Sequence, residues 1–320
     1  MILRRLSIFA DPMILTLLVA LALAAVVPVA GSSAEIARDI SNVGIFVLFL
    51  LNGMRIPRRE IARGLANWRY VVPLMLWVFG IMALMGLFFM WLAQGWLPPL
   101  VALGFLYLGV LPSTVQSATS YTTLAGGSIA LAVVGAALLN IVGVVVSAPL
   151  FALMGGGAAA DIGSDVIIRI GLILVLPFAI GQALQGWTAE WVNARKRRIV
   201  WLDRLVIGLS VYVAASGAMA QGLLGMFSAD DWTVLMVLVV AYLALASWGA
   251  WAIGVPLGLP RADRIAFLFG GSQKSIAIGA PLAAILFAPS VAGFVIAPLL
   301  VYHLAQLILA APLASRLSRS

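Results

Sequence analysis

Long apolar runs separated by short polar connections dominate this chain. Ten runs approach or exceed the length of about 20 residues with which an α-helix crosses the hydrocarbon core of a bilayer. They cover roughly 12–30, 36–54, 70–93, 99–122, 128–155, 166–187, 203–227, 232–256, 262–287 and 291–313. Because lipid cannot satisfy backbone polar groups and a barrel would show short alternating segments, the pattern predicts an all-α membrane protein with ten transmembrane helices.

The composition agrees with a chain that has lipid as its main solvent. Hydrophobic residues make up 64% of the 320 residues and charged residues 9%, with a mean hydropathy of +1.15. This excludes a soluble nucleic-acid binder in spite of the net charge of +8. The absence of cysteine excludes disulfides, thiolate metal sites and cysteine nucleophiles. Residues 1–30 begin with basic residues, but their apolar stretch fits a first span better than a removable signal peptide.

Basic residues fall on one side when the ten spans are placed in alternation. That side holds Arg4, Arg5, Arg55, Arg58, Arg59, Arg63, Arg69, Arg195, Lys196, Arg197, Arg198, Arg204, Arg261, Arg264, Arg316 and Arg319. The opposite side holds Arg38, Arg169 and the acidic residues Asp161, Asp165, Asp230 and Asp231. The positive-inside rule therefore predicts cytoplasmic termini, and we expect a protein of the bacterial inner membrane.

Five spans precede residue 155, so the second five enter the bilayer from the opposite face. Residues 1–155 and 156–320 are thus predicted to be two inverted five-helix repeats, as in many secondary transporters. The fourth span of each half contains a polar stretch with helix breakers, at 108–117 and at 269–275. Breaks in helices 4 and 9 at matching mid-membrane positions are a sequence indication of a solute site.

The two polar stretches supply the candidate ligands. Pro112 removes a backbone donor, and Gly270-Gly271 is expected to permit unwinding. The polar side chains beside these breakers are Ser113, Thr114, Gln116 and Ser117 in the first half, and Ser272, Gln273, Lys274 and Ser275 in the second. An ordinary proline kink and a glycine packing notch are the alternative.

Lys274 lies about a dozen residues into the ninth span, where a lysine costs about 2.5–3.5 kcal/mol on insertion scales. No Asp or Glu lies in the middle of a predicted span to pair with it, because Asp39, Asp203 and Asp263 fall within the first few residues of their spans. It either loses its proton or holds an anion, and we hypothesise that it supplies positive charge at the substrate site. A lysine that bonds carbonyls of the broken helices, without a ligand role, is the alternative.

His303, the single histidine, lies in the middle of the tenth span, where an ionisable group is a functional candidate. A helix–helix hydrogen bond is the other reading, and it is the favoured one for Asn52, Asn140 and Gln182. Metal-ligand spacing, a phosphate loop and paired carboxylates within the membrane are missing from the sequence. A Ser–Lys dyad with Lys274 would leave two matching breaks without a purpose, so we expect no enzyme, cofactor or metal.

These motifs resemble the bile acid:sodium symporter family, in particular its branch typified by sodium/bile acid cotransporter 7. The resemblance runs nearly end to end and is strongest in 271–281, 297–306 and 109–118. It implies a panel domain of helices 1, 2, 6 and 7 and a core domain of helices 3–5 and 8–10. Helices 4 and 9 would cross at their unwound centres, and His303 matches a histidine near the substrate in bacterial relatives.

Departures from the family pattern concern the sodium ligands. Sodium-coupled members carry Glu-Thr-Gly-x-Gln-Asn in helix 9, where this chain has Phe269-Gly270-Gly271-Ser272-Gln273-Lys274. Helix 4 has Ser117-Ala118 for the family's Ser-Asn, and helix 5 has Ala132 and Ala136 for hydroxyl ligands. The resemblance and these departures predict a secondary transporter of a small anionic solute without the two-sodium site. A sodium- or proton-coupled carrier and a non-transporting membrane regulator are the alternatives.

Overall fold

A computed structural model describes residues 12–155, 168–222 and 227–319 of the chain. Some predictions lie outside the described residues. They are those that rest on the N-terminus, on Arg4, Arg5, Asp161 and Asp165, and on 166–167 and 223–226 within two predicted spans. Within them the regular structure is helical, apart from one isolated bridge between Gln94 and Leu97.

The helices follow the predicted apolar runs. In chain order they are α2 (Pro12–Val26), α3 (Ser32–Arg55), α4 (Arg58–Ala66), α5 (Trp68–Leu76), α6 (Met82–Ala93), α7 (Pro99–Val110), α8 (Val115–Leu124), α9 (Ile129–Gly155), α11 (Leu176–Ala194), α12 (Lys196–Ala220), α14 (Ala229–Ile253), α15 (Arg261–Ser272), α16 (Ile276–Leu286) and α17 (Pro289–Leu317). Two π-helical turns, η1 (Trp77–Ile81) and η3 (Gly171–Val175), continue the helices beside them. The short helix α4 falls in the connection that we predicted between the second and third spans.

Six helical stretches in the described residues are long and apolar enough to cross a membrane. They are Trp68–Ala93, Ile129–Gly155, Ile168–Ala194, Lys196–Ala220, Ala229–Ile253 and Pro289–Leu317. The pair α7 and α8 makes a seventh if the two helices are one span bent by 63°. Helix α2 is shorter, with 15 residues, and α3 carries Glu35, Arg38 and Asp39 in its first half. The structure thus shows six such stretches, or up to seven, in the part that it describes, and the ten-helix inverted repeat stays a prediction.

The chain divides into two compact units. Unit 1 comprises Met1–Arg58, Ala160–Ser228 and Gly279–Ile296, and unit 2 comprises Arg59–Ala159, Ala229–Ile278 and Ala297–Ser320. Both halves of the sequence therefore contribute to both units.

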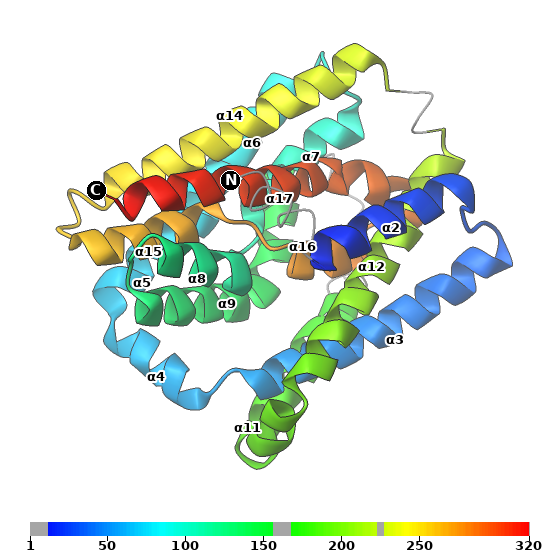
Figure 1. Cartoon of the computed structure of the whole chain (residues 1–320). Helices are drawn as coiled ribbons and strands as arrows, with labels where there is room; N and C mark the ends of the chain where they lie inside the picture. Colours follow the sequence, from blue (N-terminus) through cyan, green and yellow to red (C-terminus); the bar gives the residue numbers. More distant parts are fainter. Residues whose placement is uncertain (1–11, 156–167, 223–226, 320) are drawn as a thin grey trace. The chain divides into compact units, whose positions relative to one another are not determined.

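Unit 1 is built on α2, α3, α11 and α12 (Figure 1). Helices α3 and α11 meet backbone to backbone, because a Cβ atom added at Gly53 would lie 3.0 Å from the Cα atom of Gly181. Helices α3 and α12 are joined by a hydrogen bond of 3.1 Å between the hydroxyls of Ser41 and Ser210, and by an ion pair between Arg55 and Asp203.

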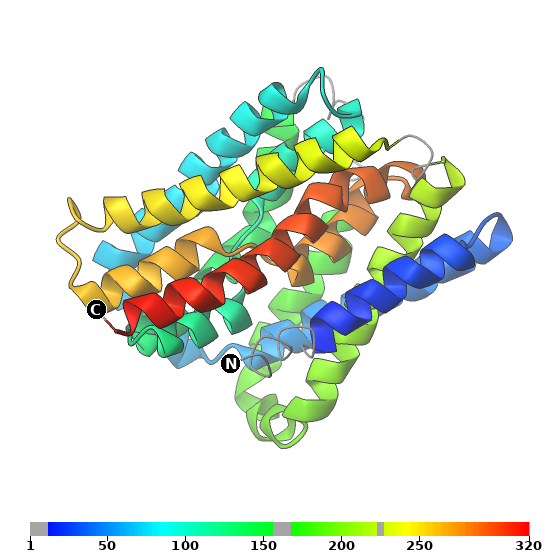
Figure 2. The ribbon, with the colours of Figure 1, turned by 45° about the horizontal axis from the view of Figure 1, so that its top comes forward.

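Unit 2 places α14 alongside α15 (Figure 2) and packs α6 against α7. A Cβ atom added at Gly109 would lie 2.9 Å from the Cα atom of Gly86, so these two helices also approach at backbone distance. The Tyr242 hydroxyl donates to the Met82 carbonyl at 2.6 Å and joins α14 to α6. This packing positions the polar breaks described next.

Candidate functional site

The predicted break in the fourth span lies at 111–114, between α7 and α8. Proline lacks an N–H group and disfavours the helical conformation in the residue before it. Leu111 is accordingly extended, with φ −75° and ψ 147°. Helix α8 then restarts at Val115, at 63° to α7.

The break in the ninth span lies at 273–275, between α15 and α16. Gln273 is extended there, with φ −80° and ψ 146°. The expectation that Gly270-Gly271 unwinds is wrong, because α15 continues through both glycines to Ser272. A Cβ atom at Gly271 would lie 2.8 Å from the Trp77 ring, whose Nε1 donates to the Gly271 carbonyl at 3.1 Å. Gly271 is therefore needed because Trp77 packs closely against it.

The two breaks contact each other within unit 2. The Ser275 N–H donates to the Pro112 carbonyl at 2.9 Å, and the Ser117 hydroxyl donates to Oε1 of Gln273 at 2.9 Å. Lys274 Nζ donates to the carbonyls of Gly109 at 2.8 Å and Leu111 at 2.7 Å.

Five successive carbonyls, at 109–110 in the last turn of α7 and at 111–113 in the break, obtain partners. The last carbonyls of a helix have no partner inside it, so each needs a donor from elsewhere. Lys274 supplies donors to residues 109 and 111, and Ser275 supplies one to residue 112. From α9, Ser147 Oγ donates to the Val110 carbonyl at 2.8 Å, and Asn140 Nδ2 donates to the Ser113 carbonyl at 3.0 Å. The interhelical role predicted for Asn140 is confirmed.

The Lys274 side chain is fully buried, with an exposure of 0%. Its ammonium group lies at the C-terminus of α7, where the helix dipole favours a cation. No carboxylate forms an ion pair with it in the described part of the chain. Both observed contacts of the ammonium are to carbonyls of the other broken helix. These are the contacts expected if Lys274 bonds the broken helices and has no ligand role.

Gln306, on α17, holds the peptide groups of Lys274. Its Oε1 accepts from the Lys274 N–H at 2.8 Å, and its Nε2 donates to the Lys274 carbonyl at 3.1 Å. The same amide lies 2.9 Å from Nδ1 of His303, so Nδ1 accepts if the ring is neutral with its proton on Nε2. Gln306 is a site residue that was not predicted, although its i+3 spacing from His303 places both residues on one helix face.

The remaining candidates differ in exposure. Ser275 Oγ accepts from the Ile278 N–H at 3.3 Å and caps α16, whereas Ser272 bonds within α15. Ser113 is buried, and its hydroxyl has no hydrogen-bond partner among the described residues. Thr114 is half-buried and Gln116 is exposed. The structure thus brings all nine predicted residues to the two breaks or to the α17 face beside them, and it leaves Thr114 and Gln116 the most accessible.

The comparison with known proteins decides the family. A sequence profile of the SBF-like CPA transporter family matches residues 11–319. The chain belongs to this family.

Similar proteins cover nearly the whole chain. "Putative symporter YfeH" of Escherichia coli strain K12 is 34% identical over 312 residues, which are 97% of this chain and 93% of that protein. "Uncharacterized protein PA2026" of Pseudomonas aeruginosa is 35% identical over 314 residues, with the same coverage of 97% and 93%. Sodium/bile acid cotransporter 7 of Mus musculus is 22% identical over 276 residues, 84% of this chain and 80% of the mouse protein.

Membership of the SBF-like CPA transporter family confirms the resemblance to bile acid:sodium symporters. The chain is an integral membrane transporter of this kind, which sits in a lipid bilayer and binds a small-molecule solute, and it is not an enzyme. Its described residues contain no cluster of three or more His, Asp or Glu that could hold a metal ion. The oxygen atoms gathered at the two breaks are mostly backbone carbonyls, and an ammonium group already lies among them.

Proposed function

We propose that this chain is a secondary active transporter that moves a small anionic organic solute by alternating access, without a two-sodium site. The observation that carries the proposal is the position of the Lys274 ammonium, which donates to the carbonyls of Gly109 and Leu111 where the two breaks meet.

A protein-borne cation is proposed to take the place of a metal ion at the breaks. Carbonyl and carboxylate oxygens are the ligands that hard cations prefer. Here the carbonyls face an ammonium group, and Phe269 and Lys274 stand where sodium-coupled members have Glu and Asn. Because this positive charge cannot leave, transport would need no sodium to assemble the two broken helices.

The solute is proposed to bind on the accessible side of the breaks. The N-terminus of α8 carries partial positive charge, which favours an anionic group. Thr114 and Gln116, at that end of α8, would donate hydrogen bonds to the solute. Lys274 would contribute through its charge. The buried residues Ser113, Ser117, Ser272, Gln273, Ser275 and His303 would hold the two breaks in the binding geometry.

The proposed architecture is ten helices in two inverted repeats, 1–155 and 156–320, with both termini cytoplasmic in a bacterial inner membrane. The division of the chain supports a panel domain and a core domain. Unit 1 gathers the helices of the first, second, sixth and seventh predicted spans, and unit 2 gathers those of the third to fifth and the eighth. Spans nine and ten contribute to both units, so Gly279–Ile296 would move with the panel.

Uptake by purified protein in proteoliposomes tests the proposal, with a solute first found by thermal-shift screening of small carboxylates, sulfates and phosphates. We expect uptake that is unchanged when choline replaces sodium, a raised KM in Gln116→Ala, and a loss of uptake in Lys274→Gln. A requirement for sodium would contradict the proposal.

Two other outcomes would favour the alternatives. Proton counter-flux that disappears in Lys274→Gln would indicate a carrier in which this lysine titrates. Absence of both binding and uptake for every solute class would indicate a membrane regulator that does not transport.

A further inference from the structure

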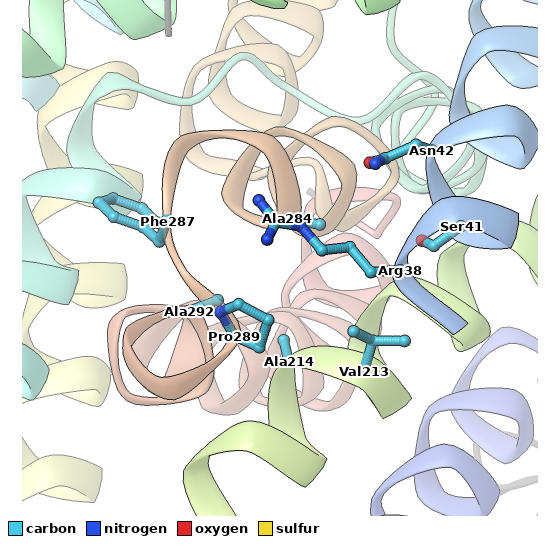
Figure 3. Close-up of a pocket in the computed structure, with 9 residues that line it drawn as sticks. All are labelled: Arg38, Ser41, Asn42, Val213, Ala214, Ala284, Phe287, Pro289 and Ala292. Atoms are coloured by element: carbon cyan, nitrogen blue, oxygen red, sulfur yellow. The ribbon is translucent and has the colours of Figure 1, made fainter. Parts of the chain in front are cut away.

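Unit 1 has two further polar features, a small pocket and an exposed helix hairpin. The pocket lies beside Arg38 and Asn42 of α3 (Figure 3) and has room for about one water molecule. The hairpin is formed by α11 and α12, which are joined so directly that Arg195 alone separates them (Figure 1). The tip of this hairpin is exposed, so it can contact a partner from outside the protein.

Basic side chains cover the hairpin tip. Four exposed basic residues follow one another there: Arg195, Lys196, Arg197 and Arg198. None of the four forms an ion pair within the described residues. Of the two carboxylates between residues 185 and 205, Asp203 pairs with Arg55, so only Glu190 could offset this charge. The hairpin tip therefore carries an excess of positive charge.

This charge does not stabilise the fold. Residues 196–198 occupy the first turn of α12, where the helix dipole favours an anion over a cation. That turn contains no acidic residue. A run of cations at this end of a helix is unfavourable by itself, so the reason for it has to be sought in what the tip contacts.

Three tryptophans lie close to the basic residues. Trp187, Trp191 and Trp201 have exposed fractions of 83%, 48% and 47%. At a rise of about 1.5 Å per residue they lie roughly 12, 6 and 9 Å from Arg195 along the helices. The headgroup region of one leaflet is about 5–8 Å thick, and tryptophan prefers the boundary between headgroups and hydrocarbon. With the basic residues among the headgroups, the three rings lie near this boundary.

Two of the rings also position arginine side chains. Cζ of Arg195 lies 4.8 Å from the ring centroid of Trp191, and Cζ of Arg204 lies 5.2 Å from that of Trp201. A guanidinium stacked on a ring still presents N–H donors along its edge, and these match two oxygens of a phosphate. The pairs therefore combine a phosphate-binding group with an apolar surface.

The opposite face of the hairpin is packed against unit 1. Val192 of α11 and Ile199 of α12 are buried in one cluster with Leu51 of α3. These contacts and the short connection leave the tip little conformational freedom. The basic residues and the rings are thus arranged before a ligand arrives, which lowers the entropic cost of binding.

We propose that the tip of the α11–α12 hairpin binds the headgroup of an anionic phospholipid. Residues 195–198 would contact its phosphate, and the three tryptophans its glycerol and upper acyl chains. Ile168–Ala194 and Lys196–Ala220 are both long and apolar enough to cross a membrane, so the connection between them lies at a bilayer surface. The inference goes beyond the proposed function, because it concerns a lipid ligand and requires no transport.

The positive-inside rule is the competing explanation for these basic residues. It acts during membrane insertion and needs no bound lipid. On that explanation, exposed arginines elsewhere on the same predicted side of the membrane would be equivalent to those of the hairpin tip.

Binding is measured on the purified full-length protein in neutral detergent, as the rise in apparent melting temperature with ligand concentration. The probes are dihexanoyl-phosphatidylglycerol, dihexanoyl-phosphatidylcholine and inorganic phosphate at equal ionic strength. We expect phosphatidylglycerol to bind at least tenfold more tightly than either of the others. A basic residue near an anionic lipid surface contributes about fivefold, so replacing all four residues 195–198 with Gln should weaken phosphatidylglycerol binding by about thirtyfold or more.

The stability of the glutamine variant without lipid shows whether it is folded. It should be at least as stable as the wild type, because it removes cations from the positive end of α12. A second variant, with Arg195→Lys, Arg197→Lys and Arg198→Lys combined, keeps the charge and should bind within about fivefold of the wild type.

The matched control also removes four exposed arginines from the predicted cytoplasmic side. It combines Arg59→Gln, Arg63→Gln, Arg316→Gln and Arg319→Gln, all of them outside the hairpin. Because screening weakens interactions between exposed charges beyond about 10 Å, this variant should change binding by less than about threefold.

Three results would overturn the inference. The first is equal binding of phosphatidylglycerol to the wild type and to the glutamine variant of residues 195–198. The second is an equal loss of binding in the control variant, which leaves the charge bias of the positive-inside rule only. The third is binding of phosphatidylcholine or inorganic phosphate that is as tight as that of phosphatidylglycerol.

Discussion

Replacing Lys274 with methionine is the most informative perturbation of stability. The side chain of methionine has similar length and volume, so the cavity term is small. The substitution removes the donors to the carbonyls of Gly109 and Leu111 and leaves both acceptors buried. Lys274→Met therefore isolates the role of the ammonium group.

The expected magnitude follows from these two contacts. A buried acceptor without a partner costs about 1–3 kcal/mol, so two of them cost about 2–6 kcal/mol. Removing a buried ammonium relieves a desolvation penalty that offsets part of this cost. We expect a net destabilisation of about 2–4 kcal/mol, which corresponds to a decrease in apparent melting temperature of about 4–10 °C.

The assay is thermal unfolding in detergent at one fixed scan rate, because membrane proteins of this size often unfold irreversibly. Lys196→Met is the matched control, since Lys196 is the other lysine of the chain and is exposed at the start of α12. It should change stability by less than about 0.5 kcal/mol. A Lys274→Met protein as stable as the wild type would show that the ammonium group is not needed as the donor to the carbonyls of Gly109 and Leu111.

Two further substitutions test the packing around the breaks. Gln306→Leu removes the hydrogen bonds to the N–H and the carbonyl of Lys274 and should lower the free energy of unfolding by about 2–3 kcal/mol, measured as above. Gln116→Leu, at an exposed position, is the control and should not lower it. Equal stability of the two variants would show that Gln306 does not hold the backbone of Lys274. Gly109→Ala would place a Cβ atom 2.8 Å from the Met82 carbonyl and should cost about 1–3 kcal/mol. Its control is Gly80→Ala, where nothing lies within 4 Å of the new atom, and a larger effect at Gly80 would be inconsistent with the packing of α6 on α7.

The sequence is informative about the breaks where their cause is local. Pro112 acts on its own N–H and on the residue before it, so the end of α7 could be predicted from the sequence. Gly270-Gly271 only permits unwinding, and whether it occurs depends on a distant residue. Trp77 packs against Gly271 from another helix, so the glycine pair stays helical and the break follows at 273–275.

The partners of the functional side chains are less accessible from sequence. Lys274 bonds backbone carbonyls, and carbonyls occur at every residue, so side-chain types give no sign of them. Gln306 was visible as a polar residue on the same helix face as His303. The residues that a helix face contacts depend on tertiary packing, which the spacing of residues along one helix does not determine.

We propose that the cation where the two breaks meet belongs to the protein and is not a sodium ion. It is tested most directly by the apparent melting temperature of the purified wild type in sodium chloride and in choline chloride at equal ionic strength, with Lys274→Gln beside it. We expect the melting temperature of the wild type to be the same in sodium chloride as in choline chloride. A melting temperature of the wild type that rises with sodium concentration would contradict it.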